Sequence, residues 1–243
     1  MQEYLTLLSN GWLQLVLTMV ISYLLGSISF SIIITRIVNN HADIRTMGSG
    51  NAGFTNVLRS VGKGPAVFTI VFDFLKGIIA VIAGWLLFAT IPAVSGGAVL
   101  QSEIICYGKF IAGMCCMLGH IYPIYFGFRG GKGVVTVAAM LAVADWRVFL
   151  AVILTFGIIF LITKTISKAS ILAAIMLPIY TFCITYFLDY LPSLSGSDGS
   201  HTIVYPIVAT DCMALVGLTV VLKHKENIKR ILNGTEKKIT AKK

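Results

Sequence analysis

Seven stretches of this sequence are strongly apolar, and most of them are long enough to cross a lipid bilayer. They lie at 12–35, 65–89, 104–127, 134–144, 148–163, 170–187 and 203–222. A membrane-spanning helix needs about 20 apolar residues. Only 12% of the residues are charged, whereas soluble domains carry roughly 25%. We therefore predict an all-α, polytopic integral membrane protein whose residues 1–243 form one membrane-embedded domain.

The N-terminal residues and the cysteines indicate which features such a membrane protein would have. No Lys or Arg occurs in the first ten residues, and the apolar stretch behind them is longer than a signal-peptide core. We expect a retained first helix and not a cleaved signal. The five cysteines all lie in apolar stretches, and none has metal-type spacing to a histidine. We expect buried thiols, with neither a disulfide framework nor a metal site.

The basic residues decide between two possible topologies. The 134–144 stretch covers only about half of a hydrocarbon core at roughly 1.5 Å per residue, so 134–163 is alternatively one tilted helix. With seven separate segments, every Lys and Arg except Lys76, Lys109 and Arg147 falls on one side. Fusing 134–163 would move the basic tail, 223–243, to the other side, against the positive-inside rule. We predict seven transmembrane helices, the N-terminus outside and the C-terminus in the cytoplasm.

Two loops on the predicted exterior, 90–103 and 188–202, contain no Lys or Arg and are rich in Ser, Gly and Pro. They are typical of connectors. The candidate chemistry is instead on the basic side.

The first candidate loop, 43–63, combines four glycines with side chains that bind anions. Hydroxyls, amides and a guanidinium donate hydrogen bonds, and the guanidinium fork matches phosphate or carboxylate oxygens. The substrate-binding candidates here are Ser49, Gly50, Asn51, Asn56 and Arg59. The alternative is a helix-connecting turn with caps.

A second candidate loop consists of Gly130, Gly131, Lys132 and Gly133, ahead of the fourth apolar stretch. Glycines allow close backbone approach to a ligand, and the N-terminus of a helix adds a positive field to the Lys132 ammonium. It is not a nucleotide P-loop, because no Ser or Thr follows the lysine. A positive-inside turn remains the alternative. His120, near the end of the third apolar stretch from which this loop leads, is either a packing residue or a catalyst.

Polar residues in the tail and in the second span give two further candidates. If the tail is helical, His224 and Asn227 share one face, and histidine titrates near neutral pH. The alternative is a basic tail that binds anionic lipid. Asp73 and Lys76 are three residues apart in a span, where ionisable residues indicate a functional site or a structural ion pair.

Taken together, three motifs resemble the signature loops of the bacterial acyl-phosphate-dependent glycerol-3-phosphate acyltransferase family (PlsY). They are Gly48-Ser49-Gly50-Asn51…Thr55-Asn56…Arg59, then Gly119-His120-x-x-Pro123…Gly130-Gly131-Lys132-Gly133, and finally His224-x-x-Asn227-Ile228…Arg230-Ile231…Gly234-x-Glu236. Asp73-Phe74-Leu75-Lys76-Gly77 and Ser167-x-x-Ser170 match further segments. The likeness covers about 25–236. One departure is Phe54, where the family usually has Ala.

The resemblance implies acyl transfer from acyl phosphate to the sn-1 hydroxyl of glycerol 3-phosphate. The products would be lysophosphatidate and inorganic phosphate, in the first step of phospholipid synthesis. It also implies a multi-pass protein of the bacterial inner membrane, with its active site on the cytoplasmic side and no cofactor or metal. The catalytic residues would be Lys132, Ser170, His224 and Asn227. We expect a monomer that contacts membrane lipid and no nucleic acid.

Two rival functions follow from the same residues. A transporter of a phosphorylated solute would place ionisable residues near the midplane and show internal repeats. No such repeat is evident here. A non-enzymatic lipid-binding scaffold would account for the basic tail but not for the glycine loops. Acyltransfer therefore remains the first hypothesis.

Overall fold

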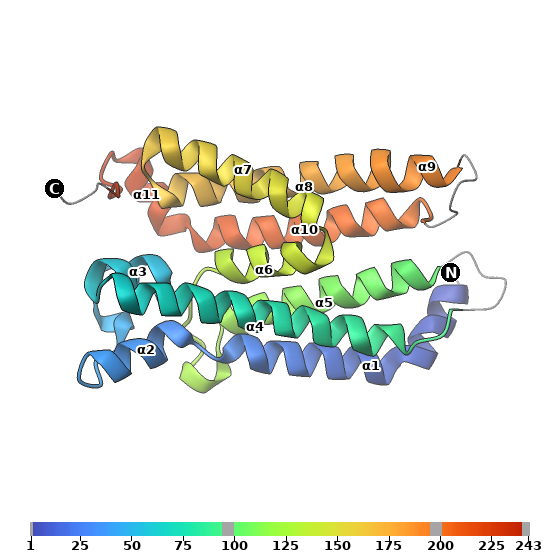
Figure 1. Cartoon of the computed structure of the whole chain (residues 1–243), viewed down its shortest axis with the longest axis horizontal. Coiled ribbons are helices and arrows are strands. Elements are labelled where there is room, and N and C mark those ends of the chain that lie inside the picture. Colours follow the sequence, from blue (N-terminus) through green and yellow to red (C-terminus); the bar gives the residue numbers. More distant parts are fainter. Residues whose placement is uncertain (1, 94–99, 195–200, 240–243) are drawn as a thin grey trace. The chain divides into compact units, whose positions relative to one another are not determined.

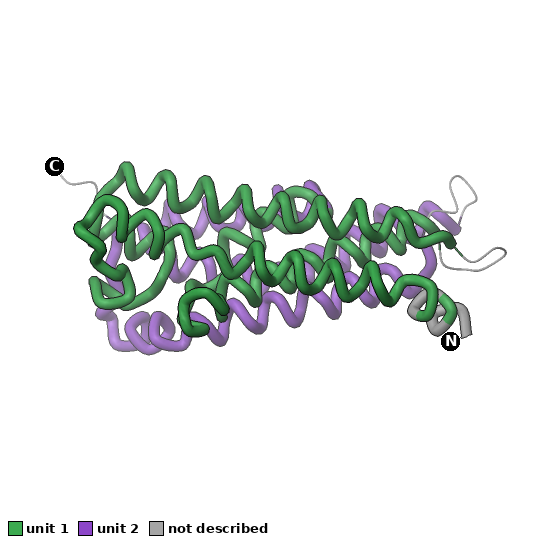
Figure 2. Tube along the Cα trace, turned by 90° about the horizontal axis from the view of Figure 1, so that it is seen from below, with its two compact units in different colours: residues 1–144 green, residues 145–243 purple. Residues whose placement is uncertain are grey.

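The computed structural model describes residues 2–93, 100–194 and 201–239. Within these ranges all regular secondary structure is helical (Figure 1). The chain divides into two compact units, 1–144 and 145–243, which Figure 2 draws in different colours. The all-α prediction is confirmed for the described residues.

The described residues of unit 1 form six α-helices and two short 3-10 turns. They are α1 (Gln2–Ser27), α2 (Phe30–Val38), η1 (Ile44–Thr46), α3 (Phe54–Ser60), α4 (Lys63–Ala89), α5 (Gln101–Ile121), η2 (Ile124–Phe126) and α6 (Val134–Ala144). The long helices α1, α4 and α5 pack against one another, and α6 packs on α4 and α5. The short elements form the loops that connect them.

Unit 2 contains the remaining helices. They are α7 (Trp146–Thr163), α8 (Ile166–Ile184), the π-helix η3 (Thr185–Tyr190), α9 (Leu191–Leu194), α10 (Val204–Lys223) and α11 (Lys225–Leu232). Helix α8 packs on both α7 and α10. Asp145 caps α7 by accepting a hydrogen bond from the Arg147 N–H at 2.9 Å, so α6 and α7 are separate helices.

Six helical segments of the described chain are long and apolar enough to cross a membrane. They are Ser9–Val38, Lys63–Ala89, Gln101–Phe126, Trp146–Thr163, Ile166–Leu194 and Val204–Lys223. The predicted span 134–144 appears as α6, a shorter apolar helix. The predicted connector 188–202 starts as helix, because helical structure continues to Leu194. Parts of both predicted exterior loops, 94–99 and 195–200, and the tail end 240–243 lie outside the described residues.

The predicted span 12–35 falls on two helices, α1 and α2, separated by Ile28 and Ser29. Such a break leaves backbone carbonyls without helical partners, which is costly inside a membrane. Here the Lys76 ammonium donates to the Ile28 carbonyl at 2.6 Å. A side chain of α4 thus stabilises the break between α1 and α2.

Glycines bring the long helices of unit 1 close together. A Cβ on Gly84 of α4 would lie 2.6 Å from the Gly108 carbonyl of α5, and a Cβ on Gly108 would lie 2.8 Å from the Gly84 carbonyl. A Cβ on Gly119 of α5 would lie 2.9 Å from the Ser27 nitrogen of α1. Small residues at helix contacts are typical of membrane proteins, because they allow close backbone packing.

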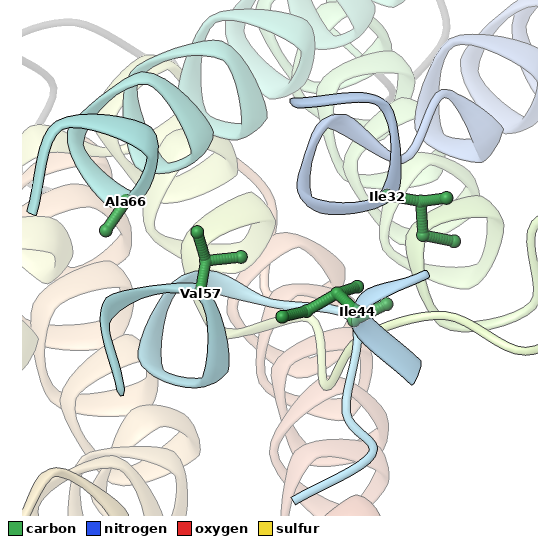
Figure 3. Packing of buried hydrophobic residues seen from close by; sticks show 5 residues of the cluster. Ile32, Ile44, Val57 and Ala66 are labelled. Atoms are coloured by element: carbon green, nitrogen blue, oxygen red, sulfur yellow. The ribbon is translucent and has the colours of Figure 1, made fainter. Parts of the chain in front are cut away.

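A small apolar core lies beneath the first candidate loop. It contains Ile32 of α2, Ile44 of η1, Ala52, Val57 of α3 and Ala66 of α4, all fully buried. Figure 3 labels four of these side chains, three from the short elements α2, η1 and α3 and one, Ala66, from the long helix α4. Burial of these side chains fixes α3 and η1 against the membrane helices, and so it anchors the loop that carries Ser49 and Arg59.

Candidate functional site

Arg45 joins the two glycine loops of unit 1. Its side chain pairs with Asp43 at 2.8 Å and donates from Nη1 to the Phe126 carbonyl at 2.6 Å and the Arg129 carbonyl at 3.3 Å. The hydrogen bond from Arg45 lowers the pKa of Asp43 to about 2, against the rise that burial would cause. Asp43 is therefore ionised at neutral pH and holds the guanidinium in place.

Asn56 organises the first loop from within. Its Nδ2 lies 3.0, 2.9 and 3.0 Å from the carbonyls of Ile44, Met47 and Asn51, and its Oδ1 accepts from the Ser49 N–H at 3.0 Å. An amide nitrogen has only two hydrogens, so these carbonyls already occupy it. Asn56 was expected to bind substrate directly, but its contacts are those of a residue that shapes the loop.

The other residues predicted in the first loop lie nearer the surface. Ser49 and Gly50 are exposed, Asn51 is half-buried, and Arg59 is exposed in the last turn of α3. The Gly50 N–H donates to the Met47 carbonyl at 2.9 Å, and its φ of +71° is one that favours glycine. Phe54, the departure from the family pattern, packs against the apolar core under the loop.

The second loop folds back on the end of α5. The Gly130 N–H donates to the Ile121 carbonyl at 3.1 Å, and the Gly131 N–H donates to the His120 carbonyl at 3.0 Å. Gly130 and Gly131 therefore have their N–H groups engaged within the protein and not turned toward a ligand. Their lack of a side chain matters instead, because a Cβ on Gly131 would meet the His120 ring and lie 2.7 Å from the Ala52 carbonyl of the first loop.

Lys132 follows at the start of α6. It is half-buried, and Gly133 after it has a φ of +85° and accepts the first helical hydrogen bond, from the Val137 N–H at 2.9 Å. The first N–H groups of a helix lack partners within the helix and carry positive partial charge. The predicted position of Lys132 at this helix end is therefore confirmed.

A buried polar cluster lies behind the second loop. Lys76 Nζ is 2.7 Å from Asp73 Oδ1 and 3.1 Å from His120 Nδ1, and these three side chains are almost completely buried. The contact between Lys76 and Asp73 is an ion pair between two residues three positions apart on α4. The cluster connects α4 with the last turn of α5, against which Gly130 and Gly131 of the second loop fold back.

His224 lies in unit 2, between α10 and α11. Its Nδ1 is 2.7 Å from the Val220 carbonyl, and the ring is buried. Because a carbonyl oxygen only accepts, Nδ1 carries the hydrogen. In the neutral ring Nε2 is then the acceptor.

Asn227 belongs to a second polar network in unit 2. Its Nδ2 donates to Ser167 Oγ and to Glu236 Oε1, each at 2.7 Å, and Ser167 Oγ donates to the same Glu236 oxygen at 2.5 Å. Arg230 Nε donates to the other Glu236 oxygen at 2.7 Å. Both amide hydrogens of Asn227 are thus engaged within this network.

Burial raises the pKa of Glu236, but the hydrogen bonds from Ser167, Arg230 and Asn227 outweigh it, so its pKa lies below the ordinary value. Ser170 is buried three residues after Ser167 and so shares its face of α8. The tail therefore holds α8 and α11 together at the segment that carries Ser170 and Asn227.

Comparisons with known proteins agree on one family. The profile described as glycerol-3-phosphate acyltransferase matches residues 16–234. The chain belongs to this family. A glycerol-3-phosphate acyltransferase of Prochlorococcus marinus (strain MIT 9215) is 38% identical over 219 residues, covering 90% of this chain and 94% of that one. Another, from Brucella anthropi, is 36% identical over 234 residues, covering 96% and 98%.

Two solved structures of PlsY (YgiH), an integral membrane glycerol 3-phosphate acyltransferase, are also similar. The glycerol 3-phosphate form is 31% identical with a TM-score of 0.71 and covers 93% of this chain and 96% of its own. The lysophosphatidic acid form is 30% identical with a TM-score of 0.68, covering 93% and 95%. The chain is thus an integral membrane member of the glycerol-3-phosphate acyltransferase family.

The sequence alone does not assign a role in the site to three residues that help to build it. Arg45 was counted only as a basic residue, and nothing in its spacing reveals that it reaches a loop 81 residues away. Ser167 and Glu236 appeared only within motifs, and their partnership spans 69 residues. For Ser167 and Glu236 the available signal was their place in motifs that resemble those of the family, and it did not distinguish ligand contacts from contacts that build the site.

Proposed function

We propose that this protein transfers an acyl group from acyl phosphate to the sn-1 hydroxyl of glycerol 3-phosphate. The products are 1-acylglycerol 3-phosphate, which is lysophosphatidate, and inorganic phosphate. The observation that carries the proposal is the likeness to one enzyme in two forms, with glycerol 3-phosphate and with lysophosphatidic acid. These two molecules are the acceptor and the product of this reaction.

The charges suit two phosphorylated substrates. Two phosphate groups repel each other, so holding both requires a strong positive field. Lys132 at the start of α6 and Arg59 at the end of α3 would supply it in unit 1, with Ser49 and Asn51 as neutral donors. Asn56, Gly130 and Gly131 would act by building the loops, and Gly50 and Gly133 by allowing their turns.

The residues of unit 2 would position the acceptor and the acyl group. His224 presents Nε2 as an acceptor, which suits a glycerol hydroxyl, and Asn227 and Ser170 would orient the reacting groups. We infer that the substrate hydroxyl oxygen attacks the acyl carbon directly. The bond between that carbon and the phosphate oxygen breaks, and phosphate leaves with the bonding electrons.

The hydroxyl proton passes to an oxygen of a substrate phosphate in this proposal. Because phosphate is a good leaving group, the reaction requires neither an acyl-enzyme nor a metal ion. Ser170 is accordingly not a nucleophile. His224 holds the hydroxyl in line, and its Nε2 is the alternative proton acceptor.

The first experiment compares acyl donors. Purified protein with palmitoyl phosphate and glycerol 3-phosphate should release inorganic phosphate in the presence of a chelator, and palmitoyl-CoA should not replace the acyl phosphate. The position of the acyl group on the product is read by NMR. Robust use of the thioester, or acylation at the sn-2 hydroxyl, would contradict the proposal.

Lys132→Ala tests the site itself. We expect the variant to lose at least about 100-fold in rate, because a preorganised charge that stabilises a developing anion is worth roughly that much. Lys63→Ala is the matched control, since Lys63 is an exposed lysine near the same loops. Full activity in the Lys132 variant, or an equal loss in both, would argue against a phosphate site there.

The rival hypothesis, a transporter of a phosphorylated solute, predicts a different result. Such a protein would move glycerol 3-phosphate across a sealed vesicle without releasing phosphate from an acyl donor. The family match supports the acyltransferase.

A further inference from the structure

The buried cluster of Asp73, Lys76 and His120 determines where the His120 ring carries its proton. An ammonium group has three N–H donors and no acceptor. Lys76 donates to the Ile28 carbonyl at 2.6 Å, faces Asp73 Oδ1 at 2.7 Å and lies 3.1 Å from His120 Nδ1. Because Lys76 can only donate, Nδ1 must accept. The proton of the neutral ring is therefore on Nε2.

The protonated edge of the ring faces the second loop. A Cβ on Gly131 would collide with Nε2, and Gly131 directly precedes Lys132. Among the residues that the structure describes, no hydrogen bond reaches His120 Nε2. His120 is nevertheless only 5% exposed. In the described part of the chain, Nε2 is not among the buried side-chain atoms that lack a partner, so this edge belongs to the small part of the ring that stays accessible. A ligand bound at the second loop can therefore accept a hydrogen bond from it.

We propose that His120 donates a hydrogen bond from Nε2 to a phosphate oxygen of the substrate that Lys132 binds. The proposal rests on the acyltransferase function proposed above and assigns a further substrate contact to it. Asp73 and Lys76 act as positioning residues, because they hold the ring in the tautomer that donates. The shared chemistry is a phosphate dianion, supplied either by the acyl donor or by glycerol 3-phosphate.

Two substitutions separate this role from simple packing. His120→Gln keeps an N–H donor near the position of Nε2 and removes Nδ1. His120→Asn keeps an acceptor for Lys76 near the position of Nδ1 and removes the donor. Steady-state kinetics measure KM for each substrate separately. A hydrogen bond to a charged group predicts a loss of about 10- to 100-fold in kcat/KM for the Asn variant. The Gln variant should stay within about threefold of the wild type.

The substrate whose KM rises in the Asn variant identifies the phosphate that His120 contacts. Equal losses in both variants, or wild-type kinetics in the Asn variant, would overturn the proposal. Phosphate release by the wild-type protein separates this result from failure of the proposed function, which would leave the wild type inactive as well.

A measurement on the unmodified protein avoids any folding defect of the variants. With ¹⁵N-labelled histidine, the Nε2 resonance of His120 should carry a bound hydrogen and should shift when inorganic phosphate is added. Phosphate addition that leaves this resonance unchanged, or a hydrogen found on Nδ1, would equally overturn the proposal.

Discussion

At the residue scale, Glu236 shows how one carboxylate can organise a segment. It accepts hydrogen bonds from Ser167, Asn227 and Arg230, which lie on two helices. Its side chain is only 4% exposed although the tail around it is mostly exposed. A carboxylate that receives several hydrogen bonds is stabilised in its charged form, so its contribution depends on ionisation.

Glu236→Gln should therefore lower the stability of the protein. Hydrogen bonds to a charged acceptor contribute about 1–3 kcal/mol, which corresponds to a fall of roughly 3–10 °C in the apparent melting temperature. A thermal unfolding assay in detergent measures it. Glu226→Gln is the control, because Glu226 is exposed on the same helix, α11. An equal change in both variants would mean that the network contributes nothing of its own.

The pH dependence of this effect has a definite sign. The pKa of Glu236 is lower in the folded protein than its ordinary value. Its stabilising effect is thus fully present above the ordinary value of about 4.3. It is lost as the pH falls through the folded value. The difference in melting temperature between wild type and Glu236→Gln should shrink in acid. A difference that grows below pH 4 would contradict this account.

The role of Asn56 could not be predicted from the sequence. Its type and place in the loop made it a good candidate for substrate binding. The structure instead turns its amide toward backbone carbonyls up to 12 residues away. Sequence spacing identifies polar residues gathered in a loop, but it does not show which of their atoms the loop itself occupies.

At the element scale, close helix contacts in unit 1 rest on paired glycines. Gly84 and Gly108 face each other across α4 and α5, and a Cβ on Gly108 would lie 2.6 Å from the Phe88 Cβ. Nothing lies within 4 Å of a Cβ placed on Gly157 of α7. The two positions give a matched pair for testing the packing.

Gly108→Ala should destabilise the protein by about 1–3 kcal/mol, because overpacking forces the helices apart. Gly157→Ala should be neutral or stabilising by up to about 1 kcal/mol, since alanine favours a helix over glycine. Thermal unfolding of both variants in the same detergent gives the comparison. Equal stability of the two would rule out the close contact of α4 and α5 as a source of stability.

The break between α1 and α2 could not be read from the sequence. The stretch 12–35 is apolar apart from Gln14 and its hydroxyl residues, and it contains no proline. What permits the break is Lys76, 48 residues away, at the Ile28 carbonyl. By contrast, the break at Asp145 has a local signal, because an Asp ahead of an apolar run is a common helix N-cap.

At the whole-molecule scale, the distribution of apolar and charged residues predicted the positions of the long helices and an orientation in the membrane. Apolar length located the long helices, since a bilayer core has a fixed thickness. The distribution of Lys and Arg gave an orientation that we retain as a proposal: seven spans including α6, with the N-terminus outside. Residues 1–243 would then form one domain, active as a monomer in the bacterial inner membrane and facing the cytoplasm.

Reporter fusions test this orientation. A fluorescent protein that matures only in the cytoplasm should be bright when fused after residue 243, because the basic tail would lie inside. A reporter at the N-terminus that is active only in the periplasm should also give a signal. A dark C-terminal fusion that is nevertheless full length would reject the proposed orientation.

The two buried imidazoles differ in one respect with a practical consequence. His224 holds its hydrogen on Nδ1 against the Val220 carbonyl, whereas His120 accepts at Nδ1 from Lys76. The two neutral rings therefore carry their hydrogen on different nitrogens, Nδ1 in His224 and Nε2 in His120. An NMR spectrum of the labelled histidines should separate the two without any probe attached. Each unit thus contains one histidine whose NMR signal can report on it. The time at which substrate contacts the residues of one unit can therefore be measured separately from the time at which it contacts those of the other.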